Sequence, residues 1–465
     1  MTKPTWSKAV TQIGREFDRT PLEIVSGSLP EGLRGTLYRN GPGRLERGNR
    51  RVGHWFDGDG AILAVQLTET GATAQYRFVQ TSGYREEEQT GTLLFGNYGM
   101  TAPGAFWNRW TRALKNVANT SVLALNDRLL ALWEAGKPHV LDLESLQTLE
   151  IENVKIPTYS AHPKRDVHAG EIFNFGCEFG LKSKLHLFVC DETGKIKRSK
   201  THELERVSLI HDFVLAGDYL VFFVPPLDVP LMSILFGLTN FSDGTRWNSS
   251  QGTQVLVFDR NLNLVSRSEA DPWFQWHFAN GYTDESGKIV LDFVKYSDFT
   301  TNQRLKEIAT GETQIAAEGY LSRVRIEPKS AKVLDTEILF DRSCEFPSVY
   351  PDRVGRNARL TYFSMHRQGV DTSRELYGSI GCYDAQTGKL HEADLGDRRY
   401  PMEPILAPDA SNPKAAWVLT VVYDAEIDRS EVWVFDAQNL ESEPVCRLAL
   451  PEIIPMGFHG TWMRR

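Results

Sequence analysis

Four of the eleven histidines lie at nearly the same distance from a hairpin pattern that the sequence repeats. They follow the residue that marks their copy of the hairpin by 18 to 23 positions, and they are His162, His211, His277 and His459. One histidine on a strand is more often a structural residue than a ligand, but four at one position of a repeat are hard to explain independently. Convergent imidazoles are typical ligands of a metal ion. The spacing therefore predicts a four-histidine metal site.

Glutamates fill the equivalent position in two other copies of the hairpin, where Glu345 and Glu403 stand. Carboxylates at such a position would either bind the metal directly or accept hydrogen bonds from the outer nitrogens of the ligating histidines. A third candidate is Glu134 in LALWEAG, although it precedes its own marker residue. Next to the first copy an insertion displaces the equivalent position, which then falls near Thr120 in NTSV. These four residues are the predicted surroundings of the metal.

The donor set limits the choice of metal. Neutral nitrogen ligands without a thiolate suit Fe(II), Cu(II), Ni(II) or a catalytic Zn(II). The five cysteines are scattered and contain no C-x-x-C pair, which argues against a zinc–thiolate site and against a disulfide framework. The chain also has no G-x-G-x-x-G, G-x-x-x-x-G-K-[ST] or H-E-x-x-H motif. Such a centre can bind O2 beside an apolar substrate without an organic cofactor.

The hairpin pattern itself occurs seven times, and its marker residues are Leu67, Asp142, Asp191, Asp259, Glu327, Asp384 and Asp436. Short runs of alternating or β-branched residues, such as KIVLDFV and WVLTVVY, indicate strands. Seven copies spaced 49 to 75 residues apart favour an all-β fold, a seven-bladed β-propeller, over an unrelated all-β arrangement. In a propeller the chain passes from the outer hairpin of one blade to the innermost strand of the next. Equal distances therefore place the histidines on the propeller axis.

Two segments interrupt the repeat. Residues 103–118 have a helical spacing of apolar residues with basic residues between them, and residues 225–238 form a second apolar insert. We expect one propeller domain over residues 1–465, with insertions at about 85–118 and 225–245 that form part of a dome of loops and helices over one face. The apolar side chains of the inserts would either be buried in this dome or dock the protein on a membrane surface.

Length, charge and hydropathy exclude several classes of protein. A chain of 465 residues exceeds the roughly 100–150 of one compact domain, which repetition explains. A net charge of −8 without a long basic cluster argues against nucleic-acid binding. The N-terminus lacks the apolar core of a signal peptide, and no run of about 18 apolar residues occurs. We expect a cytoplasmic protein that is peripheral at a membrane surface if the inserts dock there.

Together these motifs resemble those of the carotenoid cleavage oxygenases over essentially the whole chain. The motifs that carry the resemblance are LYRNGPG, HWFDGDG, NTSV, LALWE, SAHP, HDF, WHFANGY, CEFP, EPI and FHGTW. The resemblance implies a seven-bladed propeller with an iron(II) centre on its axis under a dome of loops. It also implies that the four histidines are the iron ligands and that the three glutamates orient three of them. Thr120 would be the residue whose methyl group shields one coordination position.

The resemblance further implies the reaction and favours one class of substrate. Iron(II) and O2 would cleave a C=C bond to give two carbonyl products. Family members that cleave phenolic stilbenes carry a lysine just before the first glutamate, where this chain has Trp133. Aromatic residues near the ligand motifs suit a long apolar polyene, and they are Trp133, Trp276, Tyr296 and Phe346. We therefore expect a carotenoid or apocarotenoid substrate, with a stilbene as the alternative.

Two other classes of protein are alternatives to the oxygenase. A metal-dependent propeller hydrolase would use a site rich in carboxylate and Asn ligands, and four histidines argue against it. A non-catalytic interaction propeller would have no reason to place histidines on its axis. Metal analysis separates the three classes, because only the oxygenase requires about one iron per chain.

Overall fold

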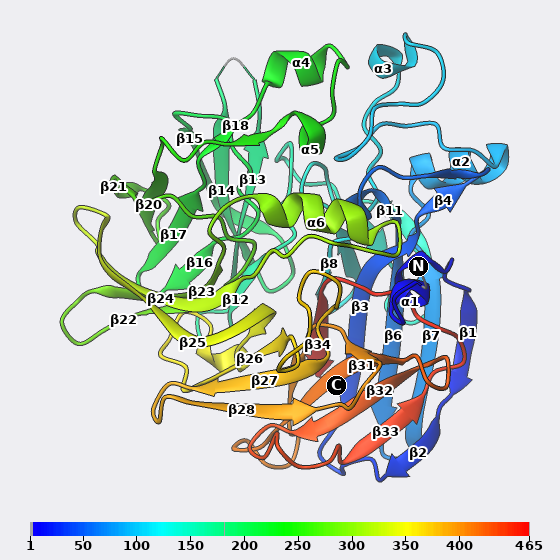
Figure 1. Ribbon diagram of the computed structural model, residues 1–465. Coiled ribbons are helices and arrows are strands. Elements are labelled where there is room, and N and C mark those ends of the chain that lie inside the picture. The colour runs from blue at the N-terminus through cyan, green and yellow to red at the C-terminus, as the bar shows by residue number, and fades with distance from the viewer. Residues whose placement is uncertain (1–2, 181, 465) are drawn as a thin grey trace.

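Antiparallel meanders of strands make up most of the computed structural model, which describes residues 3–180 and 182–464. They form seven blades around an axis (Figure 1). The first blade contains β1 (Phe17–Pro21), β3 (Gly35–Arg44), β6 (Asp59–Thr68), β7 (Gly71–Phe78) and β34 (Gly460–Arg464). The second contains β8 (Ser121–Ala124), β9 (Leu129–Leu132), β10 (His139–Leu141) and β11 (Thr148–Ile151). The third contains β12 (Lys164–Asp166), β13 (Glu171–Glu178), β14 (Lys184–Asp191) and β15 (Ile196–Glu203).

The next three blades are joined edge to edge into one continuous sheet. The fourth contains β16 (Val214–Ala216), β17 (Tyr219–Val224), β20 (Thr253–Asp259) and β21 (Leu264–Ala270). The fifth contains β22 (Phe278–Thr283), β23 (Ile289–Lys295), β24 (Tyr320–Glu327) and the first half of β25 (Lys332–Ser348). The sixth contains the second half of β25, β26 (Leu360–Met365), β27 (Ser379–Asp384) and β28 (Lys389–Asp394). The seventh contains β29 (Arg399–Pro401), β30 (Ile405–Pro408), β31 (Ala416–Asp424), β32 (Arg429–Asp436), β33 (Cys446–Ala449) and β2 (Glu23–Gly27).

Each copy of the predicted hairpin is an outer pair of strands in one blade. The seven pairs are β6–β7, β10–β11, β14–β15, β20–β21, β24–β25, β27–β28 and β32–β33, and all are antiparallel. The predicted seven-bladed propeller is therefore confirmed. All five cysteines are free thiols in the described residues.

The strand β17 is apolar along its length because both faces of its blade pack against neighbouring blades. In β17 every residue after Tyr219 is buried. Leu220 and Phe222 belong to one hydrophobic cluster, whereas Val221 and Phe223 belong to another on the opposite face. Alternating side chains of a strand point to opposite faces, so one run of apolar residues serves two interfaces.

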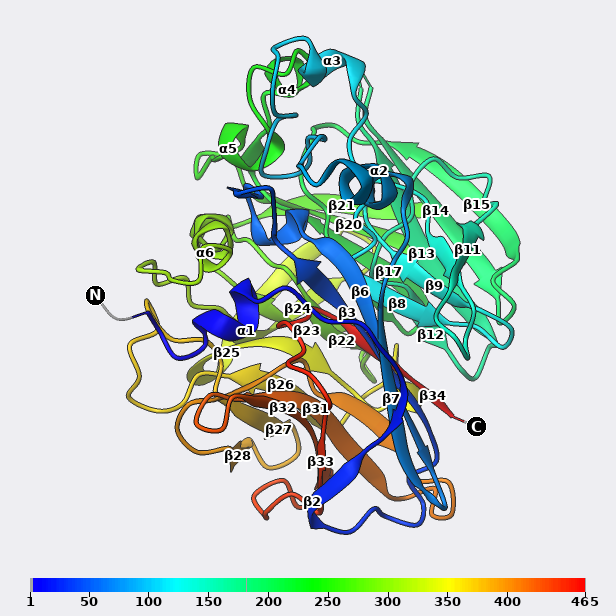
Figure 2. The same ribbon diagram turned by 90° about the vertical axis from the view of Figure 1, so that its right-hand side faces the viewer.

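The two ends of the chain close the ring. The last strand, β34, pairs with β3 in the first blade, so that Gly35 faces Arg464. The early strand β2 pairs in turn with β33 on the outer edge of the seventh blade, where Glu23 faces Ala449. The strand order of the first blade is β1-β7-β6-β3-β34, and Figure 2 shows β34 in red at the C-terminal end of the chain. The first and last blades are thus each built from both ends of the sequence.

Most helices and the short hairpins gather on one side of the propeller, mostly in the upper part of Figure 1, and form the dome. The α-helices are α1 (Ser7–Thr11), α2 (Ser82–Thr90), α3 (Asn108–Thr111), α4 (Leu231–Leu235), α5 (Phe241–Gly244) and α6 (Thr300–Ile308). The 3-10 helices are Trp55–Asp57 and Pro351–Arg353, and the short hairpins are β4 (Glu46–Arg47) with β5 (Arg50–Arg51) and β18 (Leu227–Asp228) with β19 (Arg246–Trp247). No helix in the described part of the chain is long and apolar enough to cross a membrane.

The helix predicted over residues 103–118 is wrong in its extent, because only α3 is helical. After α3 the chain runs irregularly, and the backbone N–H of Lys115 donates to the carbonyl of Gly96 at 3.1 Å. The Lys115 ammonium is buried and pairs with Asp59 and Glu87. These contacts outside the segment replace the hydrogen bonds that a longer helix would form.

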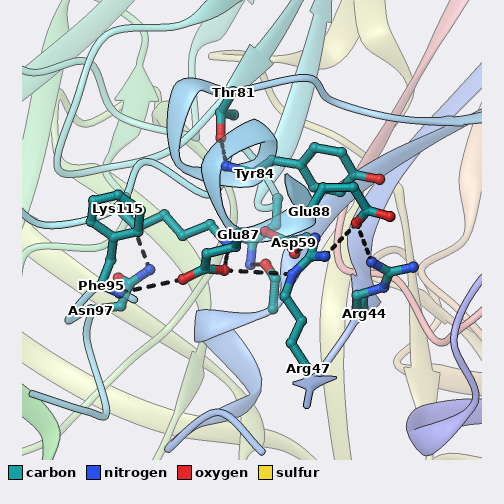
Figure 3. A network of polar contacts seen from close by, with 12 residues as sticks. Arg44, Arg47, Asp59, Thr81, Tyr84, Glu87, Glu88, Phe95, Asn97 and Lys115 are labelled. Atoms are coloured by element: carbon teal, nitrogen blue, oxygen red, sulfur yellow. Dashed lines mark hydrogen bonds and ion pairs between the residues drawn. The ribbon is translucent and has the colours of Figure 1, made fainter. Parts of the chain in front are cut away.

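Figure 3 shows the buried ion network that includes Lys115. Glu87 in α2 lies 2.6 Å from the ammonium of Lys115, and its other carboxylate oxygen accepts the backbone N–H of Leu94 at 2.8 Å. Arg47 donates to Asp59 at 2.9 Å. Side chains from α2, β4, β6 and the segment after α3 therefore meet at one point, and the network fastens this part of the dome to the first blade.

Candidate metal centre

Each of the four histidines lies just before the innermost strand of a blade. His162 precedes β12, His211 precedes β16, His277 precedes β22 and His459 precedes β34. The chain arrives at each of these points from the outer hairpin of the preceding blade and turns inward along the axis. The equal distances in the sequence reflect this repeated entry.

The four imidazoles converge, with one ring nitrogen of each lying within 4.8 Å of the others. The Nε2 atoms of His162 and His211 are 3.0 Å apart, and those of His211 and His277 are 3.2 Å apart. The side chains of His211, His277 and His459 are buried. Four nitrogen lone pairs in so small a volume repel one another, and a shared divalent cation relieves that repulsion.

Three of the histidines have a glutamate behind the ring. Nδ1 of His277 lies 2.5 Å from a carboxylate oxygen of Glu345, and Nδ1 of His459 lies 2.8 Å from Glu403. Nδ1 of His211 pairs with Glu134. A proton held at Nδ1 leaves the lone pair of Nε2 free for a metal. The glutamates lie behind the rings, so the geometry assigns them the hydrogen-bonding role rather than direct ligation.

Burial controls the charge state of the rings. Burial and the neighbouring imidazoles hold the pKa values of His162 and His459 well below the ordinary value, which keeps both rings neutral. Burial also lowers the pKa of His211, but the carboxylate of Glu134 outweighs it, and the net shift is upward. Protons and metal ions compete for the same nitrogen, so the neutral rings are ready for a cation.

Thr120 lies beside the fourth histidine, just before β8. Its carbonyl accepts the backbone N–H of His459 at 3.3 Å, and its hydroxyl contacts Asn119 at 3.2 Å. The Asn119 amide donates to the carbonyls of Phe56 and Gly58 at 2.9 and 2.7 Å. Asn119 therefore fixes the orientation of Thr120 at the centre.

A cavity of about 440 Å³ reaches this centre. Thr120, Glu134 and His211 line it together with many apolar side chains. It also extends to Leu114 and Leu235 in the dome, whose side chains are 63% and 59% exposed, so the cavity meets the surface between the segments of α3 and α4.

The four aromatic residues named from the sequence fall into two pairs. Trp133 and Trp276 line the cavity, and the Trp276 ring meets the His211 ring edge-on at 5.0 Å. Tyr296 and Phe346 are not among the described lining residues. The hydroxyl of Tyr296 donates to Glu345 at 3.1 Å, and the ring of Phe346 stacks on His277 at 5.5 Å.

Sequence reasoning did not identify Arg39, which bonds the chain directly before His459. The guanidinium is fully buried and donates to the carbonyl of Phe458 and to a carboxylate oxygen of Glu403, both at 3.2 Å. Burial raises the pKa of Glu403 to about 7, and the charge of Arg39 acts against that shift. Its only signal in the sequence is its place in the motif LYRNGPG, which gives the arginine no role.

Comparison with known proteins agrees with this architecture. The family model for the retinal pigment epithelial membrane protein matches residues 10–464. An apocarotenoid-15,15'-oxygenase from Synechocystis is 31% identical, covering 98% of this chain and 96% of the relative. A resveratrol cleavage oxygenase from Aspergillus fumigatus is 26% identical over 99% and 95%, and a carotenoid 9,10(9',10')-cleavage dioxygenase from Arabidopsis thaliana is 25% identical over 94% and 86%.

Solved structures give the same result at the level of the fold. The crystal structure of a cobalt-substituted apocarotenoid oxygenase from Synechocystis superposes with a TM-score of 0.91 at 30% identity. The match covers 99% of this chain and 98% of the other. Because the family model and the relatives cover nearly the whole sequence, the chain belongs to the retinal pigment epithelial membrane protein family, the carotenoid oxygenases that its motifs resemble.

Proposed function

We propose that the protein is a non-haem iron(II) dioxygenase that cleaves a C=C bond of a carotenoid or apocarotenoid with O2. The observation that carries the proposal is the convergence of four imidazole nitrogens at a cavity lined mostly by apolar and aromatic side chains. Relatives named as apocarotenoid and carotenoid cleavage enzymes support it, because they share the architecture from end to end.

His162, His211, His277 and His459 would hold the metal. Four neutral nitrogen donors without a thiolate fit iron(II) among the first-row metals, and Zn(II) is the poorer choice for an oxygenase because it has no redox chemistry. When bound, iron(II) would supply the chemistry that makes O2 reactive toward an alkene.

The glutamates would act as fixed acceptors rather than as acids or bases. Conversion of one C=C bond and O2 into two C=O bonds balances without gain or loss of a proton. Glu134, Glu345 and Glu403 each face a histidine Nδ1, so none of these carboxylates is free to shuttle protons. Thr120 would restrict access to one coordination position, while Phe56 and Trp276 would keep water from the reacting carbons.

The cavity supports a polyene more strongly than a stilbene. Trp133, directly before Glu134, lines the cavity and has no ammonium group to engage a phenol. Trp133 and Trp276 would contact the substrate, whereas Tyr296 and Phe346 would shape the site from behind the ligands, because one bonds Glu345 and the other packs on His277.

We further propose that residues 1–465 form a single domain whose insertions, at about 85–118 and 225–245, build the part of the dome around the cavity mouth. This part would rest on a membrane surface. The side chains of Trp107, Trp110 and Phe236 are 65%, 53% and 55% exposed, which contradicts their burial in the dome. Trp110 donates to the carbonyl of Phe236 at 2.6 Å, so the two segments offer one apolar surface.

A membrane contact at this place would serve the substrate. Polyenes are carried in membranes, and exposed aromatic and aliphatic residues mixed with basic ones are typical of interfacial binding. Arg109 and Arg112 stand among the apolar side chains, and both line the cavity. Substrate could then enter directly from the bilayer between α3 and α4.

Product analysis tests the proposed reaction. Iron-loaded protein is incubated with β-carotene, an apocarotenal and resveratrol under O2, and the products are identified by mass. We expect cleavage of one of the polyenes into two carbonyl products whose masses sum to substrate plus O2. Cleavage of resveratrol alone would show that the substrate is a stilbene rather than a polyene. Hydrolysis products without uptake of O2 would contradict the proposed dioxygenase reaction.

A further inference from the structure

One buried carboxylate contacts the chain beside three of the four proposed ligands. Asp212 directly follows His211, and its side chain is 1% exposed. One of its oxygens accepts the backbone N–H of Phe278 at 2.9 Å. The other accepts the backbone N–H of Phe213 at 2.7 Å and lies 2.7 Å from the ammonium of Lys164.

These partners belong to three different blades. Lys164 stands two positions after His162, in β12 of the third blade. Asp212 itself leads into β16 of the fourth blade, and Phe278 follows His277 in β22 of the fifth. One carboxylate therefore links the three points at which the chain enters the axis with a histidine.

We propose that Asp212 and Lys164 form a clamp that sets the spacing of His162, His211 and His277 for the metal. Asp212 is a positioning residue, because it touches the backbone and a neighbouring side chain but none of the imidazoles. The inference rests on the proposed metal centre and is independent of the substrate.

The clamp would keep the distances between the three histidines constant. The three histidines lie on separate blades, so small shifts between blades would change the distances between the ring nitrogens. Metal sites need their ligands held to within about 0.5 Å, and interactions behind the ligands supply that precision. A buried ion pair that also accepts two backbone N–H groups resists such shifts more strongly than apolar packing, because each group has a fixed direction.

A buried cation, the guanidinium of Arg39, holds the chain beside the fourth proposed ligand. Arg39 donates to the carbonyl of Phe458, directly before His459, and to the carbonyl of Glu403 at 2.9 Å. The centre therefore has a carboxylate at the backbone beside three ligands and a guanidinium at the backbone beside the fourth. Asp212 and Arg39 are thus distinct from the three glutamates that contact the imidazole rings.

The experiment measures the affinity of the metal-free protein for Co(II), by competition with a chelator, together with the visible absorption spectrum of the Co(II) form. The variants are Asp212→Asn and the double variant Asp212→Asn with Lys164→Gln. The double variant removes a positive and a negative charge together, so the field at the metal changes little while the clamp is lost. It also leaves no buried charge unpaired, so it gives a folded sample even if the single variant does not.

The matched control is Asp424→Asn in the seventh blade. The side chain of Asp424 is likewise 1% exposed, lies 2.7 Å from Arg399 and accepts the backbone N–H of Glu426 at 3.0 Å. Loss of this pair should lower thermal stability to a similar degree and leave the Co(II) affinity and spectrum unchanged.

We expect the Co(II) affinity to fall about 10-fold in both Asp212 variants, the lower end of the range for outer partners of metal ligands, with an altered spectrum. Wild-type affinity and spectrum in the double variant would overturn the clamp, because the effect of the single variant would then be one of charge alone. Failure of the wild-type protein to bind Co(II) would instead overturn the proposed metal centre, and the clamp with it.

Discussion

Each of the three glutamates fixes the orientation of one imidazole by facing its Nδ1 atom. Changing Glu345 or Glu403 to Gln keeps the shape of the side chain but weakens this hydrogen bond. We expect metal affinity or reaction rate to fall by about 10- to 100-fold in each variant.

Chelator competition measures this effect directly, and Glu203→Gln is the control because the side chain of Glu203 is exposed and pairs with the exposed Lys182. Wild-type affinity and rate in both glutamate variants would show that these carboxylates do not support the ligands.

Asp57 offers a second test at the scale of a residue, through pH. Burial raises the pKa of Asp57 from an ordinary 3.8 to about 7, while the backbone N–H of Gly99, 3.0 Å away, acts against that shift. The folded state then holds a proton that the unfolded state releases above pH 4. The contribution of the protonated Asp57 carboxyl to stability is therefore present below about pH 4 and is lost as the pH rises to about 7.

Comparison of the wild-type protein with Asp57→Asn isolates this contribution. The difference in free energy of unfolding should change by up to about 4 kcal/mol between pH 4 and pH 7, in the direction that disfavours the wild type at pH 7. Urea unfolding at several pH values provides the measurement. Parallel stability curves for the two proteins over this range would contradict the assignment.

The residues that the sequence could predict are those that repeat. The histidines and two of the glutamates occupy one position of the hairpin repeat, so their spacing alone brings them to the axis. Asp212 and Arg39 act through the backbone of residues that are distant in the sequence, with partners 66 and 419 positions away for one bond each. Nothing in the spacing of a single sequence reports such contacts.

At the scale of elements, the strands were predictable, whereas the helices inside the dome were not. Outer hairpins such as β14–β15 have a polar turn that begins at an Asp at the end of an apolar strand, and this pattern is local. The segment 103–118 has helical spacing but only four helical residues, because contacts with α2 and with residue 96 decide its course. The helix α6, inserted between β23 and β24, was not predicted from the sequence.

The ion network beneath α2 predicts that removing one of its charges lowers the free energy of unfolding. Lys115→Met would leave Asp59 and Glu87 buried with Arg47 as their shared partner (Figure 3). Removing one member of a buried ionic group costs about 3–5 kcal/mol, because the remaining charges lose their compensation. The backbone of Lys115 also bonds Asn97, which lines the cavity, so KM should rise as well.

Denaturant unfolding and steady-state kinetics check this prediction together. The control is Lys182→Met, because the side chain of Lys182 is 72% exposed and pairs with the exposed Glu203, and the effect should stay within about 1 kcal/mol. Equal free energies of unfolding for the Lys115 and Lys182 variants would contradict the claim that the ion network holds the dome to the first blade.

The exposed surface formed by the segments of α3 and α4 predicts behaviour at a lipid interface. Replacing Trp107, Trp110 and Phe236 together with polar residues should weaken liposome binding. It should also slow turnover of membrane-borne substrate more than that of detergent-dispersed substrate. Co-sedimentation with liposomes provides the measurement, and a triple change of the exposed Leu149, Ile151 and Leu334 on outer strands is the control. Unchanged liposome association of the first variant would contradict docking by this surface.

At the scale of the whole molecule, seven-fold repetition was visible in the sequence, whereas closure of the ring was not. The strands β34 and β2 lie at opposite ends of the chain from their partners β3 and β33. Such pairings have no local pattern. The propeller still determines the site, because the start of the innermost strand of every blade reaches the axis, where histidines from four blades meet.

The central claim is that this meeting point holds the metal on which the activity depends. The most direct measurement is the iron content of purified, iron-reconstituted protein, compared between the wild type and His211→Ala alongside turnover of a polyene. We predict about one iron per wild-type chain and loss of both iron and turnover in the variant, because one of four ligands is gone. Full iron occupancy with normal turnover in His211→Ala would contradict the four-histidine centre.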